Sequence, residues 1–315
     1  MENTELSRPN LIVVTGPTAS GKTAFAAQLA ARLDTEIISA DSRQVYRHMD
    51  IGTGKDYGDY EVGGKRVACH LIDICEPGEQ YNVYQFQQDF SRIYALLQRA
   101  GKVPVLAGGT GMYIEAVLRG YELSEVPADR DFRASVQEKS QEELVDMLRS
   151  INRKLHNSTD LLNRKRTIRA LEIARHMVNH SASTVHLPAI FPVVIGIKYD
   201  RESRRKRISL RLQQRLDEGL VEEVKSLIQR IGPDALLYYG LEYKYLTRYL
   251  IGELNYSEMH TGLETAIHQF AKRQMTWFRK MERSGIAIHW LDGHATPDQK
   301  LERTRAIFKK YNMTL

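Results

Sequence analysis

The segment LIVVTGPTASGKT, residues 11–23, decides how this chain folds. Its apolar, β-branched start predicts a short buried strand, and a helical pattern from Lys22 to Leu33 follows its glycine-rich turn. The turn fits GxxxxGK[ST], in which glycines let backbone N–H groups face a phosphate and the next helix adds its positive N-terminal end. The sequence therefore predicts a phosphate-binding loop between a strand and a helix.

Two side chains of this loop have expected tasks in binding phosphate. Lys22 would reach the outer phosphoryl group, and Thr23 would ligate Mg²⁺. The loop does not say whose phosphates it holds, so an enzyme that uses ATP or GTP, such as a small-molecule kinase, is the first hypothesis. The predicted phosphate-binding residues are Gly16, Pro17, Thr18, Ala19, Ser20, Gly21, Lys22 and Thr23.

Strand and helix patterns alternate after the loop. Apolar runs predict further strands at residues 36–39, 68–74, 103–106, 191–197 and 286–291, and helical patterns cover residues 82–99, 201–230, 242–250 and 257–283. Such alternation indicates an α/β fold of the P-loop type, with a parallel sheet flanked by helices. Charged amphipathic helices without strand signals fill residues 127–179. We therefore expect a core of residues 1–124 and 190–315 and an all-helical insertion at residues 125–189.

Composition limits the class of protein. With 315 residues, 42% of them hydrophobic and 27% charged, the chain can bury a full core. A net charge of +6 suits a polyanionic partner, although a solvated surface gives the same excess. Cys69 and Cys75 lack metal-binding spacing and are typical of reduced cytosolic thiols. No apolar run approaches the roughly 18 residues of a membrane span, so we expect a soluble, cytoplasmic protein without a membrane partner.

Polar residues follow two of the predicted strands. Asp41 comes after the second strand, and Gly108-Gly109-Thr110-Gly111 follows residues 103–106. The carboxyl ends of parallel strands open onto one crevice, so both segments should face the phosphate loop. Asp41 could accept a proton from a nucleophile or merely cap a helix, and the glycine segment could aim donors at the crevice or only form a tight turn.

Basic clusters would attract phosphate, although each could equally be a solvated helix face. One lies in the insertion and one on a helix whose apolar residues recur every four positions. A third stretch, near the C-terminus, interleaves basic and aromatic residues, as base-stacking sites do, although such aromatics are more often core. The clusters are Arg164, Lys165, Arg166 and Arg169; Arg201, Arg204, Arg205, Lys206, Arg207, Arg211 and Arg215; and Phe270, Lys272, Arg273, Trp277, Phe278, Arg279 and Lys280.

Several separated motifs, taken in order, resemble the bacterial tRNA dimethylallyltransferase family. They cover nearly the whole chain and are far more specific together than the phosphate loop alone. The motifs are GPTASGKT (16–23), DSRQVYRHMDIGTGK (41–55), GGTGMYIEAVL (108–118), ADxxxR (128–133), RxxRALEI (166–173), GLVEEV (219–224) and AKRQMTWFR (271–279).

This resemblance implies a reaction. The loop would hold the diphosphate of dimethylallyl diphosphate together with Mg²⁺, and no nucleoside triphosphate would be consumed. The dimethylallyl group would pass to N6 of the adenosine at position 37, next to the anticodon, in tRNAs that read codons beginning with U. The resemblance gives catalytic roles to Asp41 as the base at N6, to Thr110 at the reaction centre and to Arg211 on the diphosphate.

The partner implied is the anticodon stem-loop of tRNA, bound by a monomer. The base must leave its stack to be modified, so the insertion and C-terminal helices would have to grip the RNA. The expected tRNA-binding residues are Asp41, Ser42, Arg43, Gln44, Thr110, Arg133, Arg164, Lys165, Arg166, Thr167, Ile168, Lys272 and Arg273.

The chain departs from the family pattern at five positions. Arg43 and His48 stand where an apolar residue and a glycine are usual, and Asp56 replaces a proline. Leu241 replaces a tyrosine, and His268 replaces an arginine. These changes predict an altered loop over the donor and a shifted tRNA preference, or a lost activity.

Three other functions stay open. An adenylate isopentenyltransferase would act on free AMP, but it would not need the basic helical insertion. A small-molecule kinase would use the same loop for ATP. A non-catalytic RNA-binding module would merely retain the loop.

Overall fold

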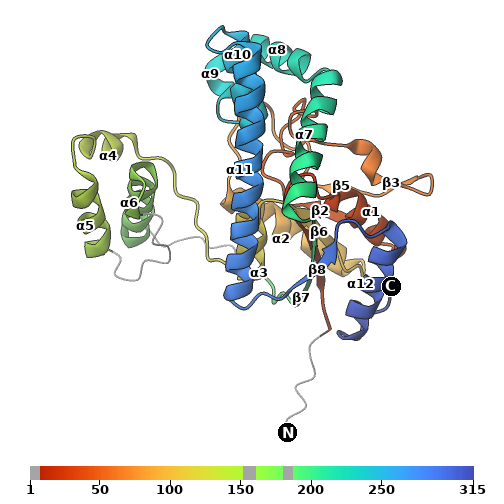
Figure 1. The fold of residues 1–315 in the computed structure, drawn as a ribbon. Helices are drawn as coiled ribbons and strands as arrows, with labels where there is room; N and C mark the ends of the chain where they lie inside the picture. The colour runs from red at the N-terminus through yellow and green to blue at the C-terminus, as the bar shows by residue number, and fades with distance from the viewer. Residues whose placement is uncertain (1–7, 152–160, 180–186) are drawn as a thin grey trace. The chain divides into compact units, whose positions relative to one another are not determined.

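The computed structural model describes residues 8–151, 161–179 and 187–315 (Figure 1). The chain forms two compact units. The larger one comprises the described residues up to Tyr121 and residues Leu187–Leu315, and the smaller one lies within Glu122–His186.

A six-stranded sheet forms the centre of the larger unit. Its order is β5-β2-β6-β1-β7-β8, and every pairing is parallel, as predicted. The strand predicted at 68–74 is much shorter, because Leu71 and Asp73 adopt left-handed backbone angles, with φ of 61° and 55°. The strands are β1 (Leu11–Thr15), β2 (Ile37–Ser39), β5 (Cys69–His70), β6 (Val105–Gly108), β7 (Pro192–Lys198) and β8 (Ile288–Asp292).

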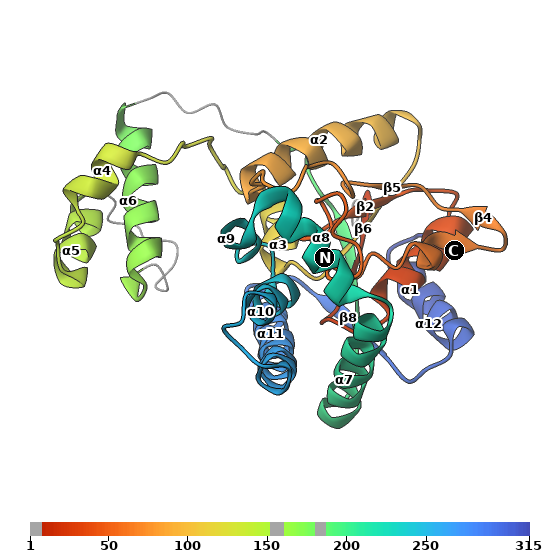
Figure 2. The ribbon, with the colours of Figure 1, turned by 90° about the horizontal axis from the view of Figure 1, so that it is seen from above.

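Helices cover both faces of this sheet (Figure 2). Successive residues of a strand point to opposite faces, so Leu11 and Val13 join one apolar cluster while Ile12 and Val14 join the other. The first face carries α2 (Val83–Arg99), α3 (Gly111–Leu118) and α11 (Tyr256–Arg283); the second carries α1 (Lys22–Arg32) and α12 (Pro297–Lys309).

The single helix predicted over residues 201–230 is wrong. Gly219, at φ 100°, breaks it into α7 (Arg201–Asp217) and α8 (Leu220–Ile231). Because glycine has no Cβ, it takes this left-handed turn at little cost. As a result α7 stands beside α11 at the edge of the sheet where the phosphate loop lies (Figure 1).

Short elements complete the larger unit. They are the 3₁₀ helix η1 (Tyr57–Tyr60), the hairpin of β3 (Glu61–Val62) and β4 (Lys65–Arg66), and the helices α9 (Pro233–Leu236) and α10 (Leu241–Leu250). No helix among the described residues is long and apolar enough to span a membrane.

The described part of the smaller unit begins with a non-helical segment, residues 122–129, and the elements that follow it there are all helices. They are α4 (Arg130–Ser135), α5 (Gln141–Ile151) and α6 (Arg164–Asn179). These helices enclose their own apolar cluster, which includes Phe132, Leu148 and Leu171. The predicted all-helical insertion is therefore confirmed as a fold.

Candidate active site

The loop after β1 has the backbone that a phosphate cradle requires. Ala19 and Gly21 take left-handed angles, with φ of 60° and 75°. A Cβ on Gly16 would lie 2.5 Å from the carbonyl oxygen of Ile197, so only glycine fits there. No side chain caps the N-terminus of α1, and the buried hydroxyl of Ser20 has no partner among the described residues. Donors are thus left for an anionic ligand.

One buried glutamine joins this loop to the glycine segment after β6. Gln274 of α11 accepts a hydrogen bond from the Thr18 N–H at 2.9 Å and donates one to the carbonyl oxygen of Gly109, also at 2.9 Å. From α7, the Nε of Arg207 donates to the carbonyl oxygen of Ala19 at 2.9 Å. Sequence reasoning gave Gln274 no role, although it lies within the motif AKRQMTWFR.

Thr110 links the ends of β2 and β6. Its hydroxyl accepts a bond from the Ser42 N–H at 3.0 Å, and its own N–H donates to the carbonyl oxygen of Ala40 at 3.2 Å. Asp41 accepts the Arg43 N–H at 2.9 Å through Oδ1. No helix begins there, so the reading of Asp41 as a helix cap is wrong, and the aspartate stabilises a turn instead.

These segments surround a cavity of about 580 Å³. Its walls come from the phosphate loop, the β2 and β6 loops, α7, α10 and α11. Of the predicted site residues, the cavity is lined by Thr18, Lys22, Thr23, Asp41, Ser42, Arg43, Gln44, Thr110, Arg211 and Arg273. The predicted loop residues Gly16, Pro17, Ala19, Ser20 and Gly21 do not line it.

The positive charges in the cavity lie close together. Burial lowers the pKa of Lys22 to about 8; Asp41 opposes this shift, while Arg211 and Arg215 add to it. Arg215, which sequence reasoning did not assign to the site, is almost fully buried and lies 3.2 Å from Glu242. The cavity can therefore hold a compact anion between one lysine and two guanidinium groups.

Both arginines already have acidic neighbours. Arg211 pairs with Asp56 at 2.6 Å, and Asp56 is one of the departures from the family pattern. Burial raises the pKa of Glu242, the partner of Arg215. The backbone approaches so closely that a Cβ on Gly54 would lie 1.8 Å from Nη2 of Arg215.

Aromatic rings form another part of the cavity wall. Tyr238 is 46% exposed, and the Arg43 guanidinium lies 5.4 Å from its ring centre. Phe270 is 40% exposed. Trp277 packs against Gly111, and its buried Nε1 has no partner among the described residues. Trp277 is only partly buried, so sequence reasoning that favoured the core missed its place in the cavity wall.

Residues 50–52, beside the cavity, are held by a carboxylate of α8. Glu223 accepts N–H groups from Asp50 at 2.9 Å, Ile51 at 2.8 Å and Gly52 at 3.0 Å. This role was also missed, although Glu223 belongs to the motif GLVEEV. Just before this segment, His48 adopts φ 61°, a conformation that explains why glycine would suit the position.

The predicted tRNA-binding residues of the smaller unit differ in what their side chains do. Arg133 pairs with the buried Glu172 at 2.7 Å, and Arg164 donates to the Val136 and Gln137 carbonyl oxygens. Thr167 is buried, and Ile168 packs against the apolar cluster. Only two cationic side chains of the set extend into solvent without an ion pair among the described residues, those of Lys165 and Arg166.

The donor set in the cavity fits magnesium better than a metal held by protein alone. Among the described residues no group of three or more His, Cys, Asp or Glu side chains could hold a metal ion. Thr23 lines the cavity, and no hydrogen bond of its hydroxyl is found within the part of the chain that the structure describes. Mg²⁺ commonly takes one or two protein ligands and completes its shell with phosphate oxygens and water.

Comparisons with known proteins agree on one family. Residues 44–281 match the family model for IPP transferase, and residues 9–69 match that for isopentenyl transferase. The chain is 56% identical to tRNA dimethylallyltransferase 1 of Parabacteroides distasonis over 94% of this chain and 97% of that one. It is 54% identical to tRNA dimethylallyltransferase 2 of Bacteroides fragilis over 96% and 99%.

A solved structure shares the fold. The crystal structure of the tRNA isopentenylpyrophosphate transferase from Bacillus halodurans superposes with a TM-score of 0.69 at 33% sequence identity. The match covers 96% of this chain and 97% of that one.

Proposed function

The chain belongs to the tRNA dimethylallyltransferase (IPP transferase) family, and we propose that it transfers a dimethylallyl group from dimethylallyl diphosphate to N6 of an adenosine in tRNA. The observation that carries this proposal is the single cavity in which Lys22, Asp41 and Thr110 meet. A phosphate cradle beside a carboxylate suits a reaction in which diphosphate leaves and a nucleophile sheds a proton.

We assign the diphosphate to the loop of residues 16–23. Its free backbone donors, Lys22, and the guanidinium groups of Arg211 and Arg215 would stabilise the negative charge that grows on the leaving group. Binding there would compete with Asp56 for Arg211. Thr23 would hold Mg²⁺, which when bound would neutralise further charge on the diphosphate oxygens.

We assign the proton of the amine to Asp41. As N6 forms its bond to the allylic carbon, the carbon–oxygen bond to diphosphate breaks and the electron pair leaves with the oxygen. The N6 lone pair is delocalised into the adenine ring, so removal of the proton during attack lowers the barrier. Oδ1 of Asp41 is held by the Arg43 N–H, which leaves Oδ2 to accept that proton.

The adenine must lie outside the RNA stack to reach Asp41. Exposed rings of Tyr238 and Phe270 offer surfaces on which a planar base can stack. We propose that the adenosine is the one at position 37, in tRNAs that read codons beginning with U, and that the smaller unit binds the anticodon stem-loop. Within that unit the side chains of Lys165 and Arg166 extend into solvent, where they could meet phosphates. We further propose that the chain works as a monomer in the cytoplasm.

A labelled-donor assay tests the proposed reaction. The protein is incubated with Mg²⁺, labelled dimethylallyl diphosphate and unmodified tRNA, and parallel reactions replace the tRNA with AMP, or the donor with ATP and candidate alcohols. Label in tRNA alone is expected, because only RNA would use the smaller unit. Label in AMP would indicate a free-nucleotide transferase, and phosphate transfer from ATP would indicate a kinase.

A further inference from the structure

A second hollow, of about 980 Å³, lies on the larger unit between α7, α11 and the ends of β7 and β8. We name it the α7–α11 groove. Most of its charged side chains are cationic, and they come from both helices. The cations that α7 and α11 contribute to it are Arg201, Arg204, Arg205, Lys272 and Arg279.

None of these five cations has an ion-pair or hydrogen-bond partner for its side chain among the described residues. Elsewhere on α7 the cations are engaged: Lys206 lies 2.9 Å from Glu202, and Arg211 lies 2.6 Å from Asp56. The unpaired cations of α7 therefore lie in the groove.

The acids that line the groove are already engaged. Asp200 accepts the Ser203 N–H and contacts Nε2 of His294, each at 2.9 Å. Glu282 accepts the Trp290 Nε1–H at 2.8 Å. Asp292 accepts the backbone N–H of His294 at 3.0 Å. None of them forms an ion pair with the groove arginines among the described residues.

The crowding of like charge has an electrostatic cost. Burial lowers the pKa of Arg204, and the neighbouring guanidinium groups of Arg279 and Arg201 lower it further. A bound anion would relieve this repulsion.

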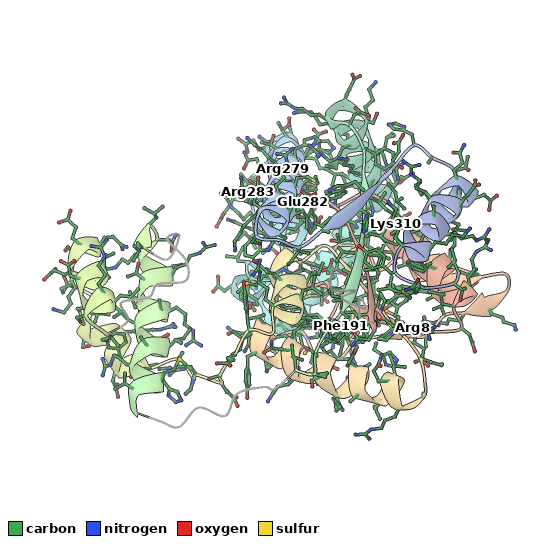
Figure 3. The ribbon with its side chains drawn as sticks, turned by 90° about the horizontal axis from the view of Figure 1, so that it is seen from below. Arg8, Phe191, Arg279, Glu282, Arg283 and Lys310 are labelled. Carbon is green, nitrogen blue, oxygen red and sulfur yellow. The ribbon has the colours of Figure 1, made fainter. Side chains whose placement is uncertain are left out.

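The groove is distinct from the catalytic cavity, although both use α7 and α11. Gln274 and Trp277 of α11 face the cavity, whereas Lys272 and Arg279 of the same helix face the groove. Figure 3 labels Arg279 and Glu282, which lie near the C-terminal end of α11 and line the groove. A ligand in the groove would therefore not occupy the cradle of residues 16–23.

We propose that the α7–α11 groove is a second binding site for phosphate groups. Guanidinium groups on two helices suit phosphate oxygens, which they bind through paired N–H donors. The phosphates would come from the RNA backbone or from free diphosphate, and the choice of these two sources rests on the proposed function.

Two binding measurements test this site. The variant Arg204→Gln/Arg205→Gln is compared with Arg303→Gln/Arg305→Gln on α12, which removes the same charge from arginines outside the groove. Unmodified tRNA is titrated over a range of salt without donor. Inorganic diphosphate is titrated into both variants in a Lys22→Ala background, which weakens the cradle.

We expect the groove variant to bind one of the two ligands about tenfold more weakly, which corresponds to ~1.4 kcal/mol of binding free energy. If the ligand is RNA, the salt slope of tRNA binding falls by about one for each lost contact. If it is free diphosphate, only the second titration changes. Unchanged affinities, or equal losses in the α12 variant, would overturn the proposal. Neither titration depends on turnover, so a missing transferase activity would be recognised separately.

The groove variant should fold normally, because it removes repulsion rather than a contact. We expect its melting temperature to equal or exceed that of the unaltered protein at low salt. A lower melting temperature together with unchanged ligand affinities would show that these arginines serve stability alone and would end the proposal.

Discussion

Asp41 lies where β2 ends, and its two carboxylate oxygens differ in their surroundings. Oδ1 holds the Arg43 N–H, while Oδ2 has no hydrogen-bond partner among the described residues. Asp41→Asn keeps the shape and the acceptor of the turn but removes the base. We expect kcat to fall about 10²–10⁴-fold, with little change in the Kd for tRNA or donor.

Single-turnover kinetics with bound tRNA would measure this loss. The matched control is Asp59→Asn, an acid of the same unit that does not line the cavity. A variant at Asp41 that retains full turnover would exclude the aspartate as the base.

We expect Lys22 to make donor binding depend on pH. Its pKa of about 8 means that the free protein loses this charge as pH rises through 8, while bound diphosphate favours the protonated form. We expect Kd for dimethylallyl diphosphate to be nearly constant below pH 8 and to rise about tenfold per unit above it.

Calorimetric titrations between pH 7 and 10 would show this profile. In Lys22→Arg the break near pH 8 should vanish, because a guanidinium stays charged throughout this range. The same break in both proteins would assign the titration to another group.

At the scale of elements, the site depends on how α11 ties two loops together. Gln274 is the one side chain that bonds both the loop of residues 16–23 and Gly109 among the described hydrogen bonds. Gln274→Leu would leave the Thr18 N–H and the Gly109 carbonyl oxygen without these bonds. We expect a loss of roughly 1–3 kcal/mol in stability and a higher KM for donor.

Chemical denaturation and steady-state kinetics would measure both effects. Gln269→Leu, at an exposed position of the same helix, should change stability by less than about 0.5 kcal/mol. Equal losses of stability in the two variants would mean that the hydrogen bonds of Gln274 to the two loops do not stabilise the protein specifically.

The elements also show where sequence patterns failed. The apolar repeat Ile208, Leu212, Leu216 and Leu220 runs across Gly219 without a gap, so periodicity alone predicted one helix. Only the positive φ of Gly219 separates α7 from α8. The hairpin of β3 and β4 escaped prediction because strands of two residues carry no measurable alternation.

At the scale of the whole molecule, positive charge lies on both units. On the smaller unit we expect Lys165→Ala/Arg166→Ala to weaken tRNA binding by about tenfold and to reduce its salt slope by about two. Donor affinity should stay unchanged, because the cradle lies entirely in the larger unit.

Filter binding across a salt series would measure these constants. Arg149→Ala removes a cation of the same unit that already lies 3.7 Å from Asp146, so it should have little effect. If Arg149→Ala weakens tRNA binding as much as the double variant does, the loss of net charge rather than of a defined contact would explain the result.

The sequence by itself determined the parallel α/β fold, the glycine-rich loop of residues 16–23 and the positions of Asp41 and Thr110, because local patterns and motifs encode elements and the strand ends that carry them. It could not determine the contacts of Gln274, Arg215 or Glu223, which join residues far apart in the chain. The family resemblance already set Arg211 apart from the other basic residues of its helix, but nothing in the sequence placed Arg204 and Arg205 in a separate groove. Which side chains contact each other depends on which faces of the helices pack together, and only the tertiary structure decides that.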